Sequence, residues 1–124
     1  MNTQVRIEAS WGQQFAVEWC AAWNARDLER ILAHYDSDIR FHSPRISLVL
    51  ERELSFVRGK EELKEYWAKA LAQAHNLHFE IAAVFMSSDA LTILYDNHRA
   101  QRVAEVFIFG PNLKVVESVA AYAD

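Results

Sequence analysis

Glu105 is the residue in this sequence whose type and position best suit acid/base chemistry. It lies in the apolar run V-A-E-V-F-I-F at residues 103–109, and a strand with apolar residues on both faces is covered on both faces. We therefore expect Glu105 to be buried, where a carboxyl group needs a donor, a raised pKa or a polar-lined pocket. One interpretation pairs it with Arg102, Arg99 or Arg45 in a structural role. The other makes it a proton donor, a proton acceptor or a ligand anchor at a cavity wall.

The cysteine and histidine content predicts neither a disulfide nor a metal site. Cys20 is the only cysteine, which excludes an internal disulfide and a zinc site built from several cysteines. We expect it to be a small core side chain. No three of the five histidines converge by their spacing, so no metal and no cofactor is predicted. His42 and His98 are the two that could reach the rim of a pocket; the alternative for each is a surface position.

The composition predicts one domain over residues 1–124, with a core large enough to be stable alone, because 52% of the residues are hydrophobic. Four Trp, four Tyr and seven Phe in so short a chain supply flat side chains that suit the walls of a cavity for an apolar ligand. The net charge of −4 comes from interspersed charges without a basic stripe, so neither nucleic acid nor membrane is an expected partner. We expect a cytoplasmic protein.

Three helices are expected to position the candidate groups. The first covers residues 10–25, where aromatic residues recur three or four apart along one face. A short second helix, capped by Asp27, would carry Tyr35 on its apolar face. The third begins at Gly59 with acidic residues in its first turn, and its buried face includes Trp67.

Turn signals separate the strands expected from alternation, which lie at residues 39–43, 77–86, 91–95, 103–109 and 114–122. Residues 36–38 are predicted to stop the second helix before the first strand. The mixed text at residues 45–58 is interpreted as a long, partly ordered loop or a small edge hairpin. Segregated helices with consecutive antiparallel strands describe an α+β domain in which one sheet curls around the helices.

Alternation also assigns side chains to the two faces of the sheet. If Glu105 points inward, Val103 and Phe107 do so as well, which leaves an apolar outer face at residues 104, 106 and 108. In the last strand, one face would carry Ser118, Ala120 and Tyr122, and the other Val115, Glu117, Val119 and Ala121. We expect a homodimer to cover the apolar outer face. The alternative is that residues 45–58 fold over it.

Four phrases of the sequence carry a resemblance to a known family. They are A-A-W-N-A-R-D-L-E-R-I-L at residues 21–32, Y-D-S-D-I-R-F-H-S-P at 35–44, R-G-K-E-E-L-K-E-Y-W at 58–67, and A-E-V-F-I-F with a G-P-N turn at 104–112. In this order they resemble the nuclear-transport-factor-2-like superfamily, especially its SnoaL-like and ketosteroid-isomerase-like branch. The resemblance implies a cone-shaped fold with a strongly curved sheet, an apolar cavity open at one end, and dimerisation through the outer face of the sheet.

The same resemblance implies roles for individual residues. Glu105 falls where the steroid isomerases have the protonated aspartic acid of their oxyanion hole, Ser43 where they have the catalytic base, and Trp19 where they have the oxyanion-hole tyrosine. Tyr35 and Trp67 fall at two further aromatic positions of the cavity. Because a serine cannot take a carbon-bound proton without a base of its own, and an indole is a weaker donor than a tuned phenol, ketosteroid isomerisation by that mechanism is not expected.

The sequence therefore predicts a pocket protein that acts on or binds a small apolar molecule, cyclic or polyketide-like in its implied class. Glu105 would be the acid/base group, and the ligand-binding candidates are Trp19, Tyr35, Ser43, Trp67, Tyr95, Phe107, Ser118 and Tyr122. Whether the protein is an enzyme stays open: it would be a cofactor-independent isomerase, cyclase or hydrolase-like protein, or else a non-catalytic ligand-binding or dimerisation domain.

Overall fold

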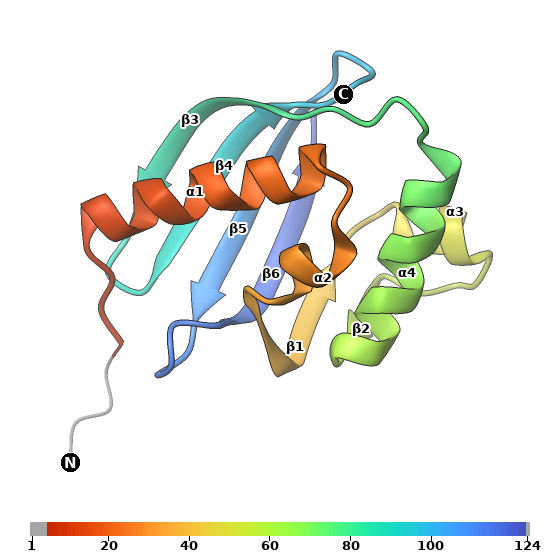
Figure 1. Cartoon of the computed structure of the whole chain (residues 1–124). Helices are drawn as coiled ribbons and strands as arrows, with labels where there is room; N and C mark the ends of the chain where they lie inside the picture. Colours follow the sequence, from red (N-terminus) through yellow and green to blue (C-terminus); the bar gives the residue numbers. More distant parts are fainter. Residues whose placement is uncertain (1–4, 124) are drawn as a thin grey trace.

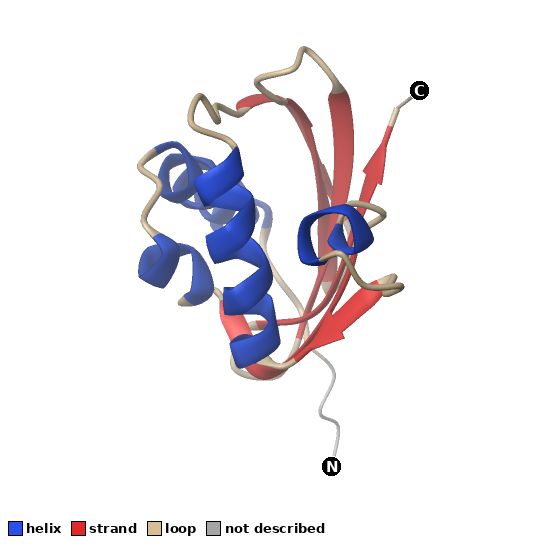
Figure 2. Cartoon of the chain, turned by 90° about the vertical axis from the view of Figure 1, so that its right-hand side faces the viewer, coloured by secondary structure: helices blue, strands red, loops and turns tan. Residues whose placement is uncertain are grey.

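A single six-stranded sheet forms the body of the protein. The computed structural model describes residues 5–123, and the strands lie in the order β2-β1-β6-β5-β4-β3. Their bounds are β1 Tyr35–His42, β2 Phe56–Arg58, β3 Glu80–Met86, β4 Ala90–Asp96, β5 Arg102–Phe109 and β6 Val115–Tyr122. Neighbouring strands are antiparallel except for β1 and β6, which are parallel. The sheet is strongly curved (Figure 2), as the α+β prediction required.

Four helices accompany the sheet: α1 Ala9–Asn24, α2 Leu28–Leu32, α3 Ile46–Leu50 and α4 Lys60–Gln73. Figure 1 shows α1 crossing one face of strands β3 to β6, with α4 beside the β1–β2 end of the sheet. The sequence predicts three of them, α1, α2 and α4, and α3 is the additional one. Within the described residues, none of these helices has the length and apolar character needed to cross a membrane.

Local sequence explains where the expected helices begin. The side chain of Asp27 accepts a hydrogen bond from the backbone N–H of Arg30, 3.2 Å away, and so caps α2. In α4, Glu61 and Glu62 occupy the first turn, where the helix dipole favours negative charge. Gly59 precedes this helix with a φ of 86°, and its N–H donates to the carbonyl of Ile39 at 2.7 Å. The turn thereby fixes α4 against β1.

The predictions for Tyr35 and residues 36–38 were wrong. Tyr35 is the first residue of β1 rather than part of the α2 face, because α2 ends at Leu32. Residues 36–38 lie inside β1, where the pairing with β6 shifts register between Tyr35 and Arg40. There the N–H of Asp38 bonds the side chain of Asp36 at 3.0 Å, so polar residues that would stop a helix mark an irregularity within a strand.

Residues 45–58 are more ordered than a long loop. They contain α3, whose buried residues Ile46, Val49 and Leu50 recur three and four apart, and the edge strand β2, which pairs Val57 with Phe41 of β1. The segment thus holds one edge strand and a helix, rather than the loop or the edge hairpin that were expected, and the helix was missed because it is only five residues long. The strand expected from residue 77 begins instead at Glu80.

Strands β5 and β6 contribute alternating side chains to the core. Val103, Glu105 and Phe107 are buried, as alternation predicts. Val115, which alternation placed on the face opposite Ser118 and Ala120, is buried, as those two residues are. The reason is that Ile108 pairs with Glu117 while Phe109 pairs with Val115. This extra residue at position 116 changes which face the start of β6 presents.

We expect Gly59→Ala to lower the free energy of unfolding by about 2 kcal/mol, because φ and ψ of 86° and 155° belong to a region that residues with a Cβ avoid. Urea unfolding followed by circular dichroism measures this. Gly12→Ala, within α1, is the control for glycine replacement without a positive φ. Its new Cβ would meet the flexible end of the Met86 side chain from β3 and, at 3.4 Å, the side chain of Leu91. Equal stability of Gly59→Ala and wild type would contradict the assignment of strain.

Candidate functional site

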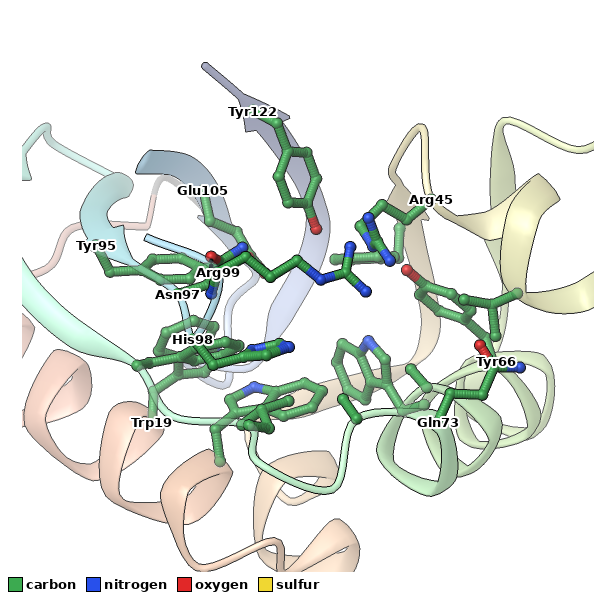
Figure 3. Close-up of a pocket in the computed structure, with 18 residues that line it drawn as sticks. Trp19, Arg45, Tyr66, Gln73, Tyr95, Asn97, His98, Arg99, Glu105 and Tyr122 are labelled. Atoms are coloured by element: carbon green, nitrogen blue, oxygen red, sulfur yellow. Dashed lines mark hydrogen bonds between the residues drawn. The ribbon is translucent and has the colours of Figure 1, made fainter. Parts of the chain in front are cut away.

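A pocket lies between the concave face of the sheet and the helices, with a cavity volume of about 90 Å³. Many of the residues around it are aromatic, and polar side chains from several segments surround it (Figure 3). The lining residues are Trp19, Trp23, Phe41, Arg45, Val49, Tyr66, Trp67, Ala70, Gln73, Ala74, Leu77, Phe79, Tyr95, Asn97, His98, Arg99, Glu105 and Tyr122.

Glu105 reaches this pocket from the middle of β5 and is the acidic group of the lining. Its side chain is 4% exposed, and the Tyr95 hydroxyl donates a hydrogen bond to its Oε1 at 2.9 Å. Burial raises the pKa of Glu105 to about 7, although the hydrogen bond from Tyr95 opposes the rise. Among residues 5–123 no arginine forms an ion pair with it, and Arg102 instead pairs with Asp96 at 2.9 Å. Among the described residues, Glu105 therefore does not form the ion pair with Arg102, Arg99 or Arg45 that was one interpretation of the sequence.

Two buried phenols stand next to this carboxyl group. Tyr95 contacts it directly, and the hydroxyl of Tyr35 accepts a hydrogen bond from the indole N–H of Trp19 at 3.0 Å. Burial raises the pKa of both tyrosines well above the usual value, and the charge of Glu105 adds to the shift. Both phenols therefore remain protonated near neutral pH, and of these three groups only Glu105 changes its charge there.

Tyr66 from α4 and Tyr122 from β6 lie on the other side of the pocket, and Figure 3 shows them flanking Arg45. Burial raises the pKa of both phenols, and the charge of Glu105 adds to the rise, whereas the nearby Ser43 hydroxyl and Arg45 guanidinium oppose it. Ser43 itself is buried, and its Oγ accepts a hydrogen bond from the backbone N–H of Arg45 at 3.2 Å. This region thus holds several hydrogen-bonding groups within electrostatic reach of Glu105.

The turn between β4 and β5 contributes Asn97, His98 and Arg99 to the lining. The side chain of Asn97 accepts hydrogen bonds from the N–H groups of Arg99 and Gln101, at 2.9 and 3.1 Å, which fixes the turn. Burial lowers the pKa of His98, and the charges of Arg99 and Arg45 lower it further. His98 thus reaches the pocket, as one of the two histidine predictions allowed.

His42, the other candidate histidine, lies elsewhere. Its Nε2 is 3.0 Å from the carboxylate of Glu117, and its ring stacks on Phe56 with centroids 5.4 Å apart. These contacts join β1 to its two neighbouring strands, away from the lining residues. His42 is therefore a partly buried histidine of the sheet.

The predicted ligand positions separate into two groups. Trp19, Trp67, Tyr95 and Tyr122 line the pocket together with Glu105. The others, Tyr35, Ser43, Phe107 and Ser118, lie behind that surface: Phe107 packs against Trp19 with ring centroids 5.3 Å apart, and Ser118 donates a hydrogen bond to the carbonyl of Val106 at 2.8 Å. These four support the lining, and contact of any of the eight with a ligand stays a prediction.

Several lining residues were missed by sequence reasoning. Tyr66, Ala70 and Gln73 follow the four- and three-residue spacing of one helical face, which is a signal that the sequence contains. Arg45 and the turn around His98 lie in irregular stretches of the chain, which have no repeating apolar spacing. Such stretches are positioned only by the completed fold.

This arrangement can move a proton without a bound metal. Because the pKa of Glu105 is near 7, the carboxyl group is populated in both protonation states near neutral pH and suits general acid/base work. Within residues 5–123, His, Cys, Asp and Glu form no group of three that could hold a metal ion.

A family model described as the SnoaL-like domain matches residues 16–116. The chain belongs to the SnoaL-like family. A SnoaL-like protein of unknown function from Burkholderia thailandensis E264 is 39% identical, with coverage of 96% of this chain and 99% of that one and a TM-score of 0.90. The fold of this SnoaL-like protein is that of the nuclear-transport-factor-2-like superfamily, which confirms the resemblance inferred from the sequence.

More distant solved structures share the fold alone. AclR, a putative hydroxylase from Streptomyces galilaeus, is 19% identical over 94% of this chain and 77% of its own, with a TM-score of 0.73. TerC, crystallised with polyporic acid, is 13% identical over 90% of this chain and 91% of its own, also with a TM-score of 0.73. A comparison with functionally curated proteins finds no match to this SnoaL-like protein.

We expect the stability of wild type, relative to Glu105→Gln, to fall as the pH rises. The folded protein holds the proton of Glu105 up to a pKa of about 7, whereas the usual value is 4.5, so the folded state binds more protons than the unfolded state between these values. The full relative stability is present below about pH 4.5 and is lost by about pH 7, a change on the order of 3 kcal/mol. Urea unfolding of both proteins across this range measures the difference, and a constant difference would show that the carboxyl group is not desolvated.

Proposed function

We propose that this SnoaL-like protein binds a small apolar molecule in the pocket and transfers a proton on it through Glu105. The observation that carries the proposal is a carboxyl group with a pKa of about 7 at the wall of an aromatic pocket, bonded to one neutral phenol. Structural carboxylates are normally paired with cations, which lower their pKa. A carboxyl group left near neutrality suits proton transfer.

The shape of the pocket supports a ligand with flat rings. Trp23 and Trp67 meet edge to face with centroids 5.1 Å apart, and Trp67 packs likewise on Phe41 at 5.4 Å. Such walls favour aromatic or unsaturated cyclic molecules. The cavity of about 90 Å³ is smaller than the roughly 300 Å³ or more that encloses a drug-sized ligand, so we infer that one or two rings enter it.

The proposed chemistry assigns separate tasks to three groups. With Oε1 of Glu105 held by Tyr95, Oε2 is the oxygen that takes a proton from a bound ligand and returns it at another position. Tyr95 keeps its own proton, because burial raises its pKa, and so steadies the carboxylate while it is charged. The aromatic walls exclude water, which strengthens each of these interactions. No cofactor is needed for this transfer.

The fold relatives give this proposal indirect support. TerC has been crystallised with polyporic acid, and AclR is described as a putative hydroxylase. Proteins of this fold are therefore found with small organic molecules and with proposed enzymatic roles. Because these sequence identities are too low to assign the relatives' ligands to this protein, its ligand must be inferred from its own pocket.

The test uses 2-tetralone, a bicyclic ketone with exchangeable protons next to its carbonyl group. In D₂O, wild type is expected to accelerate hydrogen–deuterium exchange, followed by ¹H NMR, with a rate that rises through about pH 7 as Glu105 ionises. Glu105→Gln should lower the rate by at least about 100-fold.

Glu117→Gln is the matched control, because Glu117 lies on β6 beside His42 and outside the pocket lining. It should exchange the ketone at the wild-type rate. Binding is followed separately through the indole ¹H–¹⁵N signals of Trp23 and Trp67, with Trp11 as a tryptophan outside the lining. If 2-tetralone shifts the pocket signals but wild type gives no exchange above buffer, the protein is a non-catalytic binder, which is the alternative function.

We also propose that the protein is a homodimer joined through the outer face of the sheet. Phe85 of β3 and Val119 of β6 are exposed, and between them β5 presents the half-buried Val106 and Ile108 on the same side. In this register row Thr92 of β4 lies between Phe85 and Val106, so the face is apolar except at that position. An exposed, largely apolar face of this kind is unfavourable in water and is normally covered by a partner.

Light scattering after size exclusion should give twice the chain mass of 14.3 kDa for wild type. Val119→Lys should shift the protein toward the monomer, because a buried unpaired charge is costly. Val17→Lys, an exposed position on α1 at the opposite layer, should leave the mass unchanged. A monomeric wild type at micromolar concentration would refute this proposal.

A further inference from the structure

Two arginines from separate segments meet at the polar side of the pocket. Arg45 directly precedes α3, and Arg99 lies in the turn between β4 and β5. Both line the pocket, and both also line a shallow hollow next to it. Figure 3 shows their guanidinium groups extending toward one another in front of the aromatic floor. The charges of both act on His98, which places them around the same opening.

Neither of these guanidinium groups is paired with a carboxylate among the residues that the structure describes. Three other arginines are paired: Arg30 with Glu18 at 2.7 Å, Arg52 with Glu65 at 2.9 Å and Arg102 with Asp96 at 2.9 Å. Within residues 5–123, no carboxylate forms an ion pair with Arg45 or Arg99. The exposed Arg40 and Arg58 are unpaired there too, but they lie outside the pocket lining that Arg45 and Arg99 share. Like charges that converge without an anion repel each other. Although the net charge of the chain is −4, the two converging arginines have no carboxylate partner among the described residues, so a bound anion would stabilise them.

Glu105 does not neutralise the arginines. Its pKa is set by burial and by Tyr95, without a contribution from an arginine. The pocket therefore has an inner side, with the titrating carboxyl group, and an outer side with two permanent positive charges. Trp23, a lining residue that is 5% exposed, has an indole N–H for which the described part of the chain provides no hydrogen-bond acceptor. The pocket thus offers donors, and a ligand must bring acceptors.

We propose that the ligand is an organic anion, with its ring system against the aromatic walls and a carboxylate between Arg45 and Arg99. This inference rests on the proposed function of the pocket and names the class of molecule it takes. A planar guanidinium matches a carboxylate through two parallel hydrogen bonds. The anion binds at the outer side because its charge would be repelled by ionised Glu105 at the inner side. The arginines therefore orient the ligand and present its apolar end to Glu105.

The test compares two probes of nearly the same shape, 1-naphthoate and the neutral 1-naphthamide. Titrations follow the indole ¹H–¹⁵N signals of Trp23 and Trp67, which line the pocket, with Trp11 as an internal control outside it. Wild type is expected to bind the carboxylate at least about tenfold more tightly than the amide, as charge-assisted hydrogen bonds require. Added salt should weaken the binding of 1-naphthoate and leave that of 1-naphthamide nearly unchanged.

The variants separate the arginines from the rest of the pocket. Arg45→Gln with Arg99→Gln should lower the affinity for 1-naphthoate by about tenfold or more and change that for 1-naphthamide little. Arg99→Gln alone, at an exposed turn position, keeps the test valid if the double variant folds poorly, and should give part of the loss. Arg58→Gln is the matched control, because Arg58 is an exposed residue of β2 outside the lining.

Each outcome decides one proposal. Equal affinity of wild type for both probes, or an unchanged preference for 1-naphthoate in the double variant, would overturn the anion inference and leave the apolar pocket standing. If neither probe shifts the Trp23 and Trp67 signals at millimolar concentration, ring binding in the pocket is itself wrong and the inference falls with it. A loss of both probes in Arg99→Gln would show a structural role for that arginine and would also overturn the inference.

Discussion

The burial of one carboxyl group beneath a layer of aromatic rings is the constraint on which the rest of the site depends. Glu105 keeps a pKa of about 7 only while β5 holds it inside, Tyr95 alone bonds it, and water and arginines stay away. The long α1 helix meets this requirement by placing Trp19 over the neighbouring Tyr95 and Phe107, with ring centroids 5.3 Å away from each. The environment that makes Glu105 costly for folding is the same one that makes it useful for proton transfer.

The fold and the acid were accessible from the sequence because each leaves a local signal. An apolar run around Glu105 can be covered on both faces only inside the protein, and alternation then assigns Val103 and Phe107 correctly. The four sequence segments that resemble the family indicate the order of the helices and strands. Where a single register shift intervenes, as at Val115, alternation fails completely, because one extra residue reverses the faces. Tyr35 was misplaced for a related reason: its apolar spacing fits the helix that ends at Leu32 as well as the strand that follows.

The outer half of the site was not accessible in this way. Arg45 and Arg99 are brought together by two irregular segments, α3 with its preceding turn and the link between β4 and β5. Neither segment has a period, so their approach depends on the completed sheet. Sequence reasoning even assigned both arginines a possible role as partners of Glu105. The structure separates the positive charges from the acid and gives the pocket two ends of different chemistry.

The parallel pairing of β1 with β6 has a consequence for how the protein is made. In the sheet order β2-β1-β6-β5-β4-β3, the strand that comes last along the chain occupies an interior place. Until β6 has left the ribosome, β1 and β2 have no neighbour that joins them to the antiparallel strands, and the cavity has no continuous wall. Contacts of such large sequence separation form slowly. The nascent chain therefore carries its aromatic surface exposed until β6 has emerged from the ribosome, a period in which chaperone protection would matter most.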